Sequence, residues 1–306
     1  MKHSLLFGNG LNQVTSNGPE WNELLKQLKG DNDFKNGNLP NTMIYERIFM
    51  EKKKSELEHE IYIKDKISEM MKAINSSKFY ELILDLNLDN YMTTNYDYAF
   101  QKSFKGKLTN MSTESIYSIR RYWLLENKKM NSKLWHIHGE IDHSKTIQLG
   151  LDQYCGSIGK IDAYIKGTYP YPQKGKKLKS IAIETKCIDN SNNKFDSISW
   201  VELFFSTNIH IIGFGLDYSE TDLWWILNKR ARLMMKNNII INNKIKFYTH
   251  NIEDEKKGLL ESLKVDVILI NEFTTPMQIN EKETKYKTDY EELYKYIIKI
   301  IKEELK

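Results

Sequence analysis

The stretch Ser4-Leu5-Leu6-Phe7-Gly8-Asn9-Gly10-Leu11-Asn12 decides the fold. An apolar run at 4–7 passes directly into two glycines that a single asparagine separates. A buried strand that ends in a glycine turn is typical of the first strand of a nucleotide-binding α/β domain, because glycine lets the backbone approach a phosphate closely. We therefore expect 4–7 to be a strand inside a mostly parallel open sheet.

Further strands and helices alternate along the chain. Apolar segments that predict strands occupy 88–94, 133–138, 208–212, 244–249 and 265–270. The range 219–235 predicts a helix that Ser219 caps, with Glu220 and Asp222 in its first turn. A closing helix is expected at 290–305, because its apolar residues share one face. Strands interleaved with helices favour an α/β fold with a parallel sheet.

Two segments depart from this alternation. From about 20 to 83, apolar residues recur at helical spacing, which predicts a helical insertion or small module. From about 150 to 199, glycines and prolines predict a loop-rich segment. We expect one domain over 1–306 that includes both segments.

Composition excludes several classes of protein. The chain has 306 residues, 45 Lys plus Arg against 41 Asp plus Glu, and a net charge of +4, which gives no sign of direct nucleic-acid binding. Its two cysteines cannot form a disulfide framework or a four-thiolate zinc site. Since no apolar run is long enough for a membrane span or a signal peptide, we expect a cytoplasmic protein with no membrane partner.

Four clusters of polar residues or glycine follow directly after predicted strands. They are 8–12 (GNGLN), 93–97 (TTNYD), 136–139 (HIHG) and 213–217 (GFGLD). Ligands of open α/β sheets bind beyond the carboxyl ends of the strands, so these clusters are expected to meet at one cleft.

Three of these clusters also have a structural interpretation. The first is a common kind of turn, Asp97 is a good helix cap, and a histidine before a glycine is often simply buried and hydrogen-bonded. His136, His138 and His143 fall within eight residues, but no cysteine or carboxylate stands at ligand spacing, so we expect no metal site.

The order GxGxN, TTNYD, HxHG and GFGLxYxExD resembles the SIR2 family, and most closely the SIR2-like domains of bacterial anti-phage defence proteins that consume NAD. The resemblance runs from Gly8 to about Asn251. It implies a Rossmann-like NAD-binding domain with a smaller helical module. Asn12 stands where sirtuins usually have serine, and Thr94 where they have glutamine, and both substitutions look like the defence branch.

The resemblance also implies roles for single residues. Asn95 and His138 match the catalytic asparagine and histidine. Residues expected to bind NAD are Gly8, Asn9, Gly10, Asn12, Thr94, Asp97, Gly213, Gly215 and Asn251.

The function implied is that of an NAD glycohydrolase, which converts NAD and water into nicotinamide and ADP-ribose. NAD is then the substrate. The two CxxC pairs of the deacylase zinc ribbon are missing, so we expect no zinc. Two alternatives stay open: a sirtuin-type NAD-dependent protein deacylase, and a non-catalytic module that senses NAD or ADP-ribose.

The implied partners follow from the danger of destroying NAD. Such an enzyme must be kept inactive until it is needed. Assembly into a homo-oligomer is one way to do this. At 306 residues there is little room for a sensor domain, so the trigger is expected in a separately encoded defence partner, such as an ATPase or a nuclease-like protein, or in a further part of a longer polypeptide.

Overall fold

The fold is known from a computed structural model, which describes residues 1–306 except 15–17, 19–20, 31–33, 52–55, 112–115, 174, 189–193 and 281–282. The start of the expected helical insertion at Glu20, and part of the expected loop-rich segment, therefore lie outside the described residues. Among the described helices, none combines the length and the apolar character that a bilayer crossing requires.

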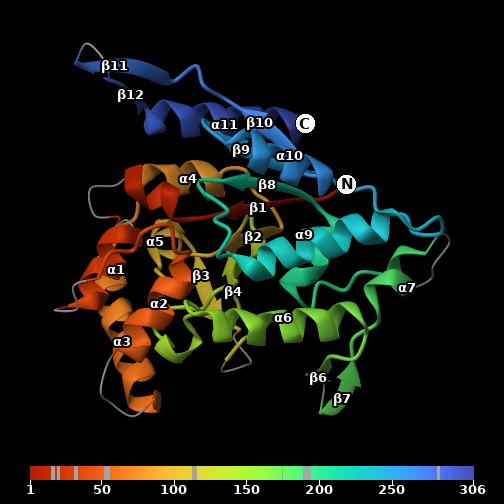
Figure 1. Cartoon of the computed structure of the whole chain (residues 1–306). Coiled ribbons are helices and arrows are strands. Elements are labelled where there is room, and N and C mark those ends of the chain that lie inside the picture. The colour runs from red at the N-terminus through yellow and green to blue at the C-terminus, as the bar shows by residue number, and fades with distance from the viewer. Residues whose placement is uncertain are drawn as a thin grey trace.

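A large sheet forms the centre of the molecule (Figure 1). Its strands lie in the order β10-β9-β8-β1-β2-β5-β4-β3. The strands from β10 to β5 are parallel to one another, whereas β4 and β3 are antiparallel additions at one edge. Their bounds are His3–Phe7 (β1), Asn90–Thr93 (β2), Lys107–Asn110 (β3), Tyr122–Glu126 (β4), Asn131–His136 (β5), Asn208–Ile212 (β8), Ile245–Thr249 (β9) and Asp266–Leu269 (β10).

The parallel strands have the order of a dinucleotide-binding fold. Ranked by their place in the chain, they lie in the order 3-2-1-4-5-6, with β1 and β8 as the strands at which the order reverses. This is the mixed α/β, Rossmann-like, mostly parallel open sheet that the sequence predicts. The crevice at the reversal point is the usual ligand site of such sheets.

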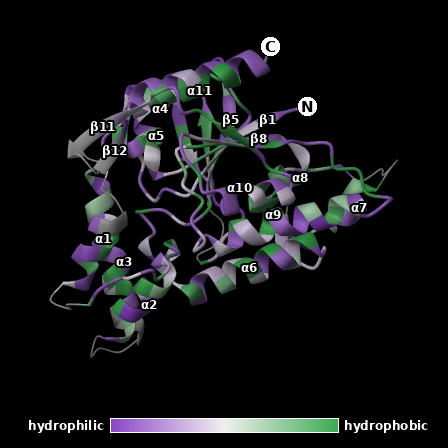
Figure 2. Ribbon diagram, turned by 45° about the horizontal axis from the view of Figure 1, so that its top comes forward, coloured by the Kyte–Doolittle hydropathy of each residue, from purple (hydrophilic) through white to green (hydrophobic). Residues whose placement is uncertain are grey.

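Helices cover both faces of the sheet. Along β1, Leu5 and Phe7 pack into one apolar core, and Leu6 packs into the other. The first face is covered by α1 (Trp21–Lys29), α2 (Asn41–Met50), α3 (Glu56–Lys72), α4 (Lys78–Leu84), α5 (Ala99–Ser103) and α11 (Tyr290–Glu304). The second face is covered by α6 (Leu151–Ile165), α7 (Ile183–Cys187), α8 (Leu203–Ser206), α9 (Thr221–Met234) and α10 (Asp254–Ser262). The ribbons of α6 and α11 carry hydrophobic and hydrophilic bands, as expected where one helix face is buried (Figure 2).

Smaller elements complete the chain. Two antiparallel hairpins are formed by β6 (Pro170–Gln173) with β7 (Lys176–Lys179), and by β11 (Thr274–Asn280) with β12 (Glu283–Thr288). Short 3-10 helices span Asn9–Val14, Ser144–Thr146 and Trp200–Glu202.

The structure differs from the sequence interpretation at two places that bear on the site. Helix α6 occupies the first part of the segment expected to be loops, and it packs against α9 (Figure 1). Ser219 does not cap α9, because its hydroxyl bonds to the Asp217 carboxylate instead. Glu220 takes the cap position without a side-chain bond to the helix backbone, which leaves its carboxylate available for other contacts.

Candidate active site

A cleft of about 330 Å³ lies at the carboxyl ends of the parallel strands. Cavities of this order hold small-molecule ligands in many proteins. Residues from all four clusters line it, and those among them that were predicted to act on or bind NAD are Asn9, Gly10, Thr94, Asn95, Asp97, His138, Gly213 and Gly215. Residues far apart in the chain thus meet where the strand order reverses.

The two glycine turns touch each other across the reversal point. The Gly10 N–H donates to the carbonyl of Gly213 at 2.8 Å. A Cβ on Gly10 would stand 2.7 Å from that same carbonyl oxygen, which is closer than real Cβ contacts. Gly213 has a φ of +56°, and a Cβ there would stand 2.8 Å from Leu11 Cγ. The close approach of the turns therefore requires glycine at both positions.

Three residues predicted to bind NAD do not line the cleft. Gly8 lies beneath Phe214, where a Cβ would stand 2.7 Å from the ring. Asn251 is exposed beyond β9, although its neighbours Thr249 and His250 line the cleft. Asn12 is fully buried behind the first glycine turn.

Asn12 connects the first turn to the second cluster. Its amide nitrogen donates to Asn9 Oδ1 at 3.0 Å and to Asp97 Oδ2 at 2.8 Å, and its oxygen accepts from the Tyr80 hydroxyl at 2.6 Å. Asp97 also accepts from the Ala99 N–H at 2.8 Å, so it bonds to the first N–H of α5 although Tyr98 holds the N-cap position. Burial raises the pKa of Asp97 above its ordinary value, although the hydrogen bonds from Ala99 and Asn12 oppose the rise. These contacts position the turns around the cleft.

Asn95 is held by hydrogen bonds of its backbone, and it lines the cleft. Its N–H donates to Thr93 Oγ1 at 3.0 Å, and its carbonyl lies 3.2 Å from His136 Nδ1. The amide nitrogen Nδ2 is buried and makes no hydrogen bond of normal geometry to a described residue, although the Asn95 side chain lies close to the Tyr80 hydroxyl. A buried polar atom of this kind at a cleft is a good candidate for contact with a ligand or a water molecule.

The three histidines of the segment 136–143 do not lie together. His136 ends β5, and its Nε2 lies 2.7 Å from Gln101 Nε2. The ring is deep in the core, and burial lowers the pKa of His136. His143 is exposed. Only His138, just beyond the strand, lines the cleft.

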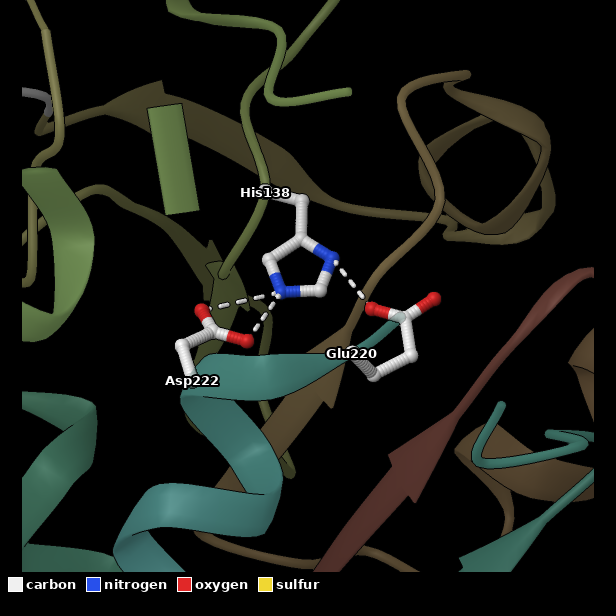
Figure 3. A group of neighbouring side chains, drawn as sticks. All are labelled: His138, Glu220 and Asp222. Atoms are coloured by element: carbon white, nitrogen blue, oxygen red, sulfur yellow. Dashed lines mark hydrogen bonds and ion pairs between the residues drawn. The ribbon is translucent and has the colours of Figure 1, made fainter. Parts of the chain in front are cut away.

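His138 lies between two carboxylates (Figure 3). Its Nε2 is 3.2 Å from both carboxylate oxygens of Asp222, and its Nδ1 is 3.4 Å from Glu220 Oε2. Burial by itself would lower the pKa of His138, but the charges of Asp222 and Glu220 and the hydrogen bond with Asp222 together raise it. The ring therefore carries a proton at pH values where an ordinary histidine has begun to lose it.

Both carboxylates have further partners on α6. Ser157 Oγ donates to Asp222 Oδ2 at 3.3 Å, and the Tyr154 hydroxyl donates to Glu220 Oε2 at 2.9 Å. His138, Glu220 and Asp222 offer ligand atoms within 4.8 Å of one another. Since one ring nitrogen faces each carboxylate, an ion bound to all three would have to displace the contacts that the imidazole now makes.

The sequence interpretation missed part of this site. Glu220 and Asp222 are the two acidic residues of the GFGLxYxExD motif, which was the available signal, but they were given no role beyond the first turn of a helix. Tyr154 and Ser157 lay in a segment expected to be loops. The cleft is also lined by residues of α11 and of the end of β9, which are Tyr248, His250, Tyr290, Leu293, Tyr294 and Ile297. The apolar face of 290–305 was expected to pack on the core, and nothing in its spacing indicated a cleft.

Comparison with known proteins supports the resemblance. Residues 89–183 match the family model described as SIR2-like domain. This range contains Asn95, Asp97 and His138, and it ends before the second glycine turn. No curated protein matched the chain. SIR2-like domains use NAD as a substrate, which agrees with the cleft at the reversal point of the sheet. Residues 89–183 are therefore similar to the SIR2-like domain family.

Proposed function

We propose that this protein is an NAD glycohydrolase that converts NAD and water into nicotinamide and ADP-ribose. The main support is the meeting of Asn95 and His138, from two separate strand ends, in one cleft between two glycine turns. The glycine turns allow the pyrophosphate to approach the backbone. The residues lining the cleft between the turns and His138 would hold the nicotinamide ribose.

Cleavage of the glycosidic bond develops positive charge on the ribose, as in glycoside hydrolysis. Asn95 has a buried amide nitrogen that makes no hydrogen bond of normal geometry to a described residue, which suits it to orient a ribose hydroxyl or the attacking water. Holding the reactants in one geometry lowers the barrier by a large entropic contribution. His138 contributes charge and orientation next to Glu220. Asp97 keeps the loop in place through Asn12 and Ala99.

The biological role we propose is anti-phage defence through NAD depletion. Support comes from Asn12 and Thr94, the two positions at which the motifs resemble the defence branch more than the sirtuins. We further propose that the enzyme works in the cytoplasm, where NAD is abundant, and that a homo-oligomer or a separately encoded defence partner restrains it.

The test is release of nicotinamide from NAD by the purified protein. We expect Asn95→Ala and His138→Ala each to lower the rate about 100-fold or more, as loss of a positioned polar group in a site typically does. His143→Ala serves as a matched control, because this histidine is exposed and does not line the cleft. A wild-type rate in either cleft variant would refute the role of that residue. Binding of NAD without any turnover of the wild-type protein would instead favour a sensor.

A further inference from the structure

The contacts of His138 bear on which group accepts a proton from the attacking water. Both of its ring nitrogens face carboxylates, Nε2 towards Asp222 and Nδ1 towards Glu220. A protonated imidazole between two carboxylates donates on both sides and has no lone pair to offer to a water molecule in the cleft. Another group must then accept the proton that the attacking water loses.

The two carboxylates differ in what they can offer. Asp222 has a side chain that is 0% exposed, and it already accepts from Ser157 and from the Leu223 N–H at 2.8 Å. Glu220 is 10% exposed and lines the cleft. Its contacts with Tyr154 and His138 both involve Oε2, and Figure 3 shows its other oxygen turned away from the ring. One carboxylate oxygen of Glu220 is thus held in place, and the other is available to a water molecule in the cleft.

We propose that Glu220 accepts the proton of the attacking water. In this proposal His138 and Asp222 are positioning residues: His138 orients Glu220 and favours its ionised form, and Asp222 holds the His138 ring in place. This inference rests on the proposed NAD hydrolysis. Tyr154 adds a second fixed contact, since its hydroxyl reaches Glu220 Oε2 from α6. The carboxylate is therefore held from α6 and from the end of β5 while it faces the cleft.

The step balances without an oxidant or a reductant. The water oxygen forms a bond to C1′ of the nicotinamide ribose, and the bond from C1′ to the pyridinium nitrogen breaks. The electron pair of that bond goes to the nitrogen, so nicotinamide leaves as a neutral molecule. One water proton passes to the Glu220 carboxylate and is later released to solvent.

The surroundings of Glu220 suit it to exchange a proton. Titratable or charged groups that face it are His138 beyond β5, Asp222 on α9, Asp217 before α9, Tyr154 on α6 and Tyr96 beyond β2. Burial raises the pKa of Glu220 above its ordinary value, and His138 opposes part of the rise. A base with a pKa nearer to the working pH is more effective than an ordinary carboxylate.

The first test compares rates over pH for the wild-type protein and Glu220→Gln. We expect kcat to fall about 100-fold in the variant, with little change in KM, because the amide keeps the shape but accepts no proton. In the wild-type protein kcat should rise with pH as Glu220 ionises, and this acidic limb should vanish in the variant. A Glu220→Gln protein with wild-type kcat, or with the acidic limb retained, overturns the proposal.

A second test separates proton transfer from structural support. Formate added to Glu220→Ala should restore part of the rate, because a small carboxylate can enter the space left in the cleft. Asp222→Ala serves as the matched control and should not respond, since Asp222 is 0% exposed. Equal responses of the two variants, or no rescue of a Glu220→Ala protein that still binds NAD, would contradict the inference. Inactivity of the wild-type protein towards NAD would instead show that the proposed function itself is wrong.

Discussion

At the scale of single residues, the cleft depends on backbone conformations that few side chains tolerate. Gly213 has a left-handed φ and touches Leu11, whereas Gly215 lines the same cleft with nothing within 4 Å of a Cβ. Both were predicted from the resemblance as one turn with one role. The structure separates them into a glycine that the fold requires and a glycine that only adjoins the ligand space.

This difference predicts distinct effects of two equivalent substitutions. Gly213→Ala should lower the free energy of unfolding by at least about 1–2 kcal/mol, from the left-handed backbone alone. Gly215→Ala should leave stability within about 0.5 kcal/mol of the wild-type protein, because it meets no neighbouring atom. Urea unfolding of the two variants measures both values. Equal losses of stability would mean that the turn does not have the described conformation.

At the scale of the element, β1 and β8 are joined by side chains as well as by the backbone hydrogen bonds of the sheet. His3 Nδ1 on β1 lies 2.9 Å from His210 Nε2 on β8, and His210 Nδ1 lies 3.1 Å from the Tyr248 hydroxyl on β9. Burial lowers the pKa of His210 to about 4, with Glu304 opposing the shift and His3 and Lys246 adding to it. The central strands therefore contain a histidine that is neutral in the folded state.

The lowered pKa of His210 determines how stability changes with pH. Between about pH 6.5 and 4 the unfolded chain binds more protons at this position than the folded chain, so stability falls as the pH falls. Between pH 7 and pH 4.5, we expect the free energy of unfolding of the wild-type protein to fall by about 2 kcal/mol more than that of His210→Gln. Chemical unfolding at the two pH values checks this. Parallel losses in both proteins would show that His210 does not titrate as described.

Also at the scale of the element, some segments were more predictable than others. The strand expected at 208–212 is β8, Asn208–Ile212, because a short apolar run between turns has few alternatives. Helix α6 was missed because Gly156 and Gly159 suggested loops. Gly156 instead allows close packing, since a Cβ there would stand 2.6 Å from the ring of Tyr117. A single sequence does not distinguish a glycine that breaks a helix from one that makes room for a neighbour.

At the scale of the whole molecule, the chain forms a cleft from segments that are far apart in sequence. The predicted catalytic pair comes from the ends of β2 and β5, and Glu220 comes from the start of α9. Further lining residues come from α11 near the C-terminus, and Figure 1 shows where these elements lie. Strand ends were predictable because parallel strands place their carboxyl ends at one edge. The pairing of His138 with Asp222 and Glu220 depends on how α6 and α9 pack, which no local spacing records.

The most direct test of the central claim is the amount of nicotinamide and ADP-ribose formed from NAD by the purified wild-type protein in the absence of any acylated peptide. We predict that both products appear in equal amounts and that an acylated peptide does not change the rate. Intact NAD after prolonged incubation, or nicotinamide release that depends strictly on an acylated peptide, would contradict the proposal that water is the acceptor.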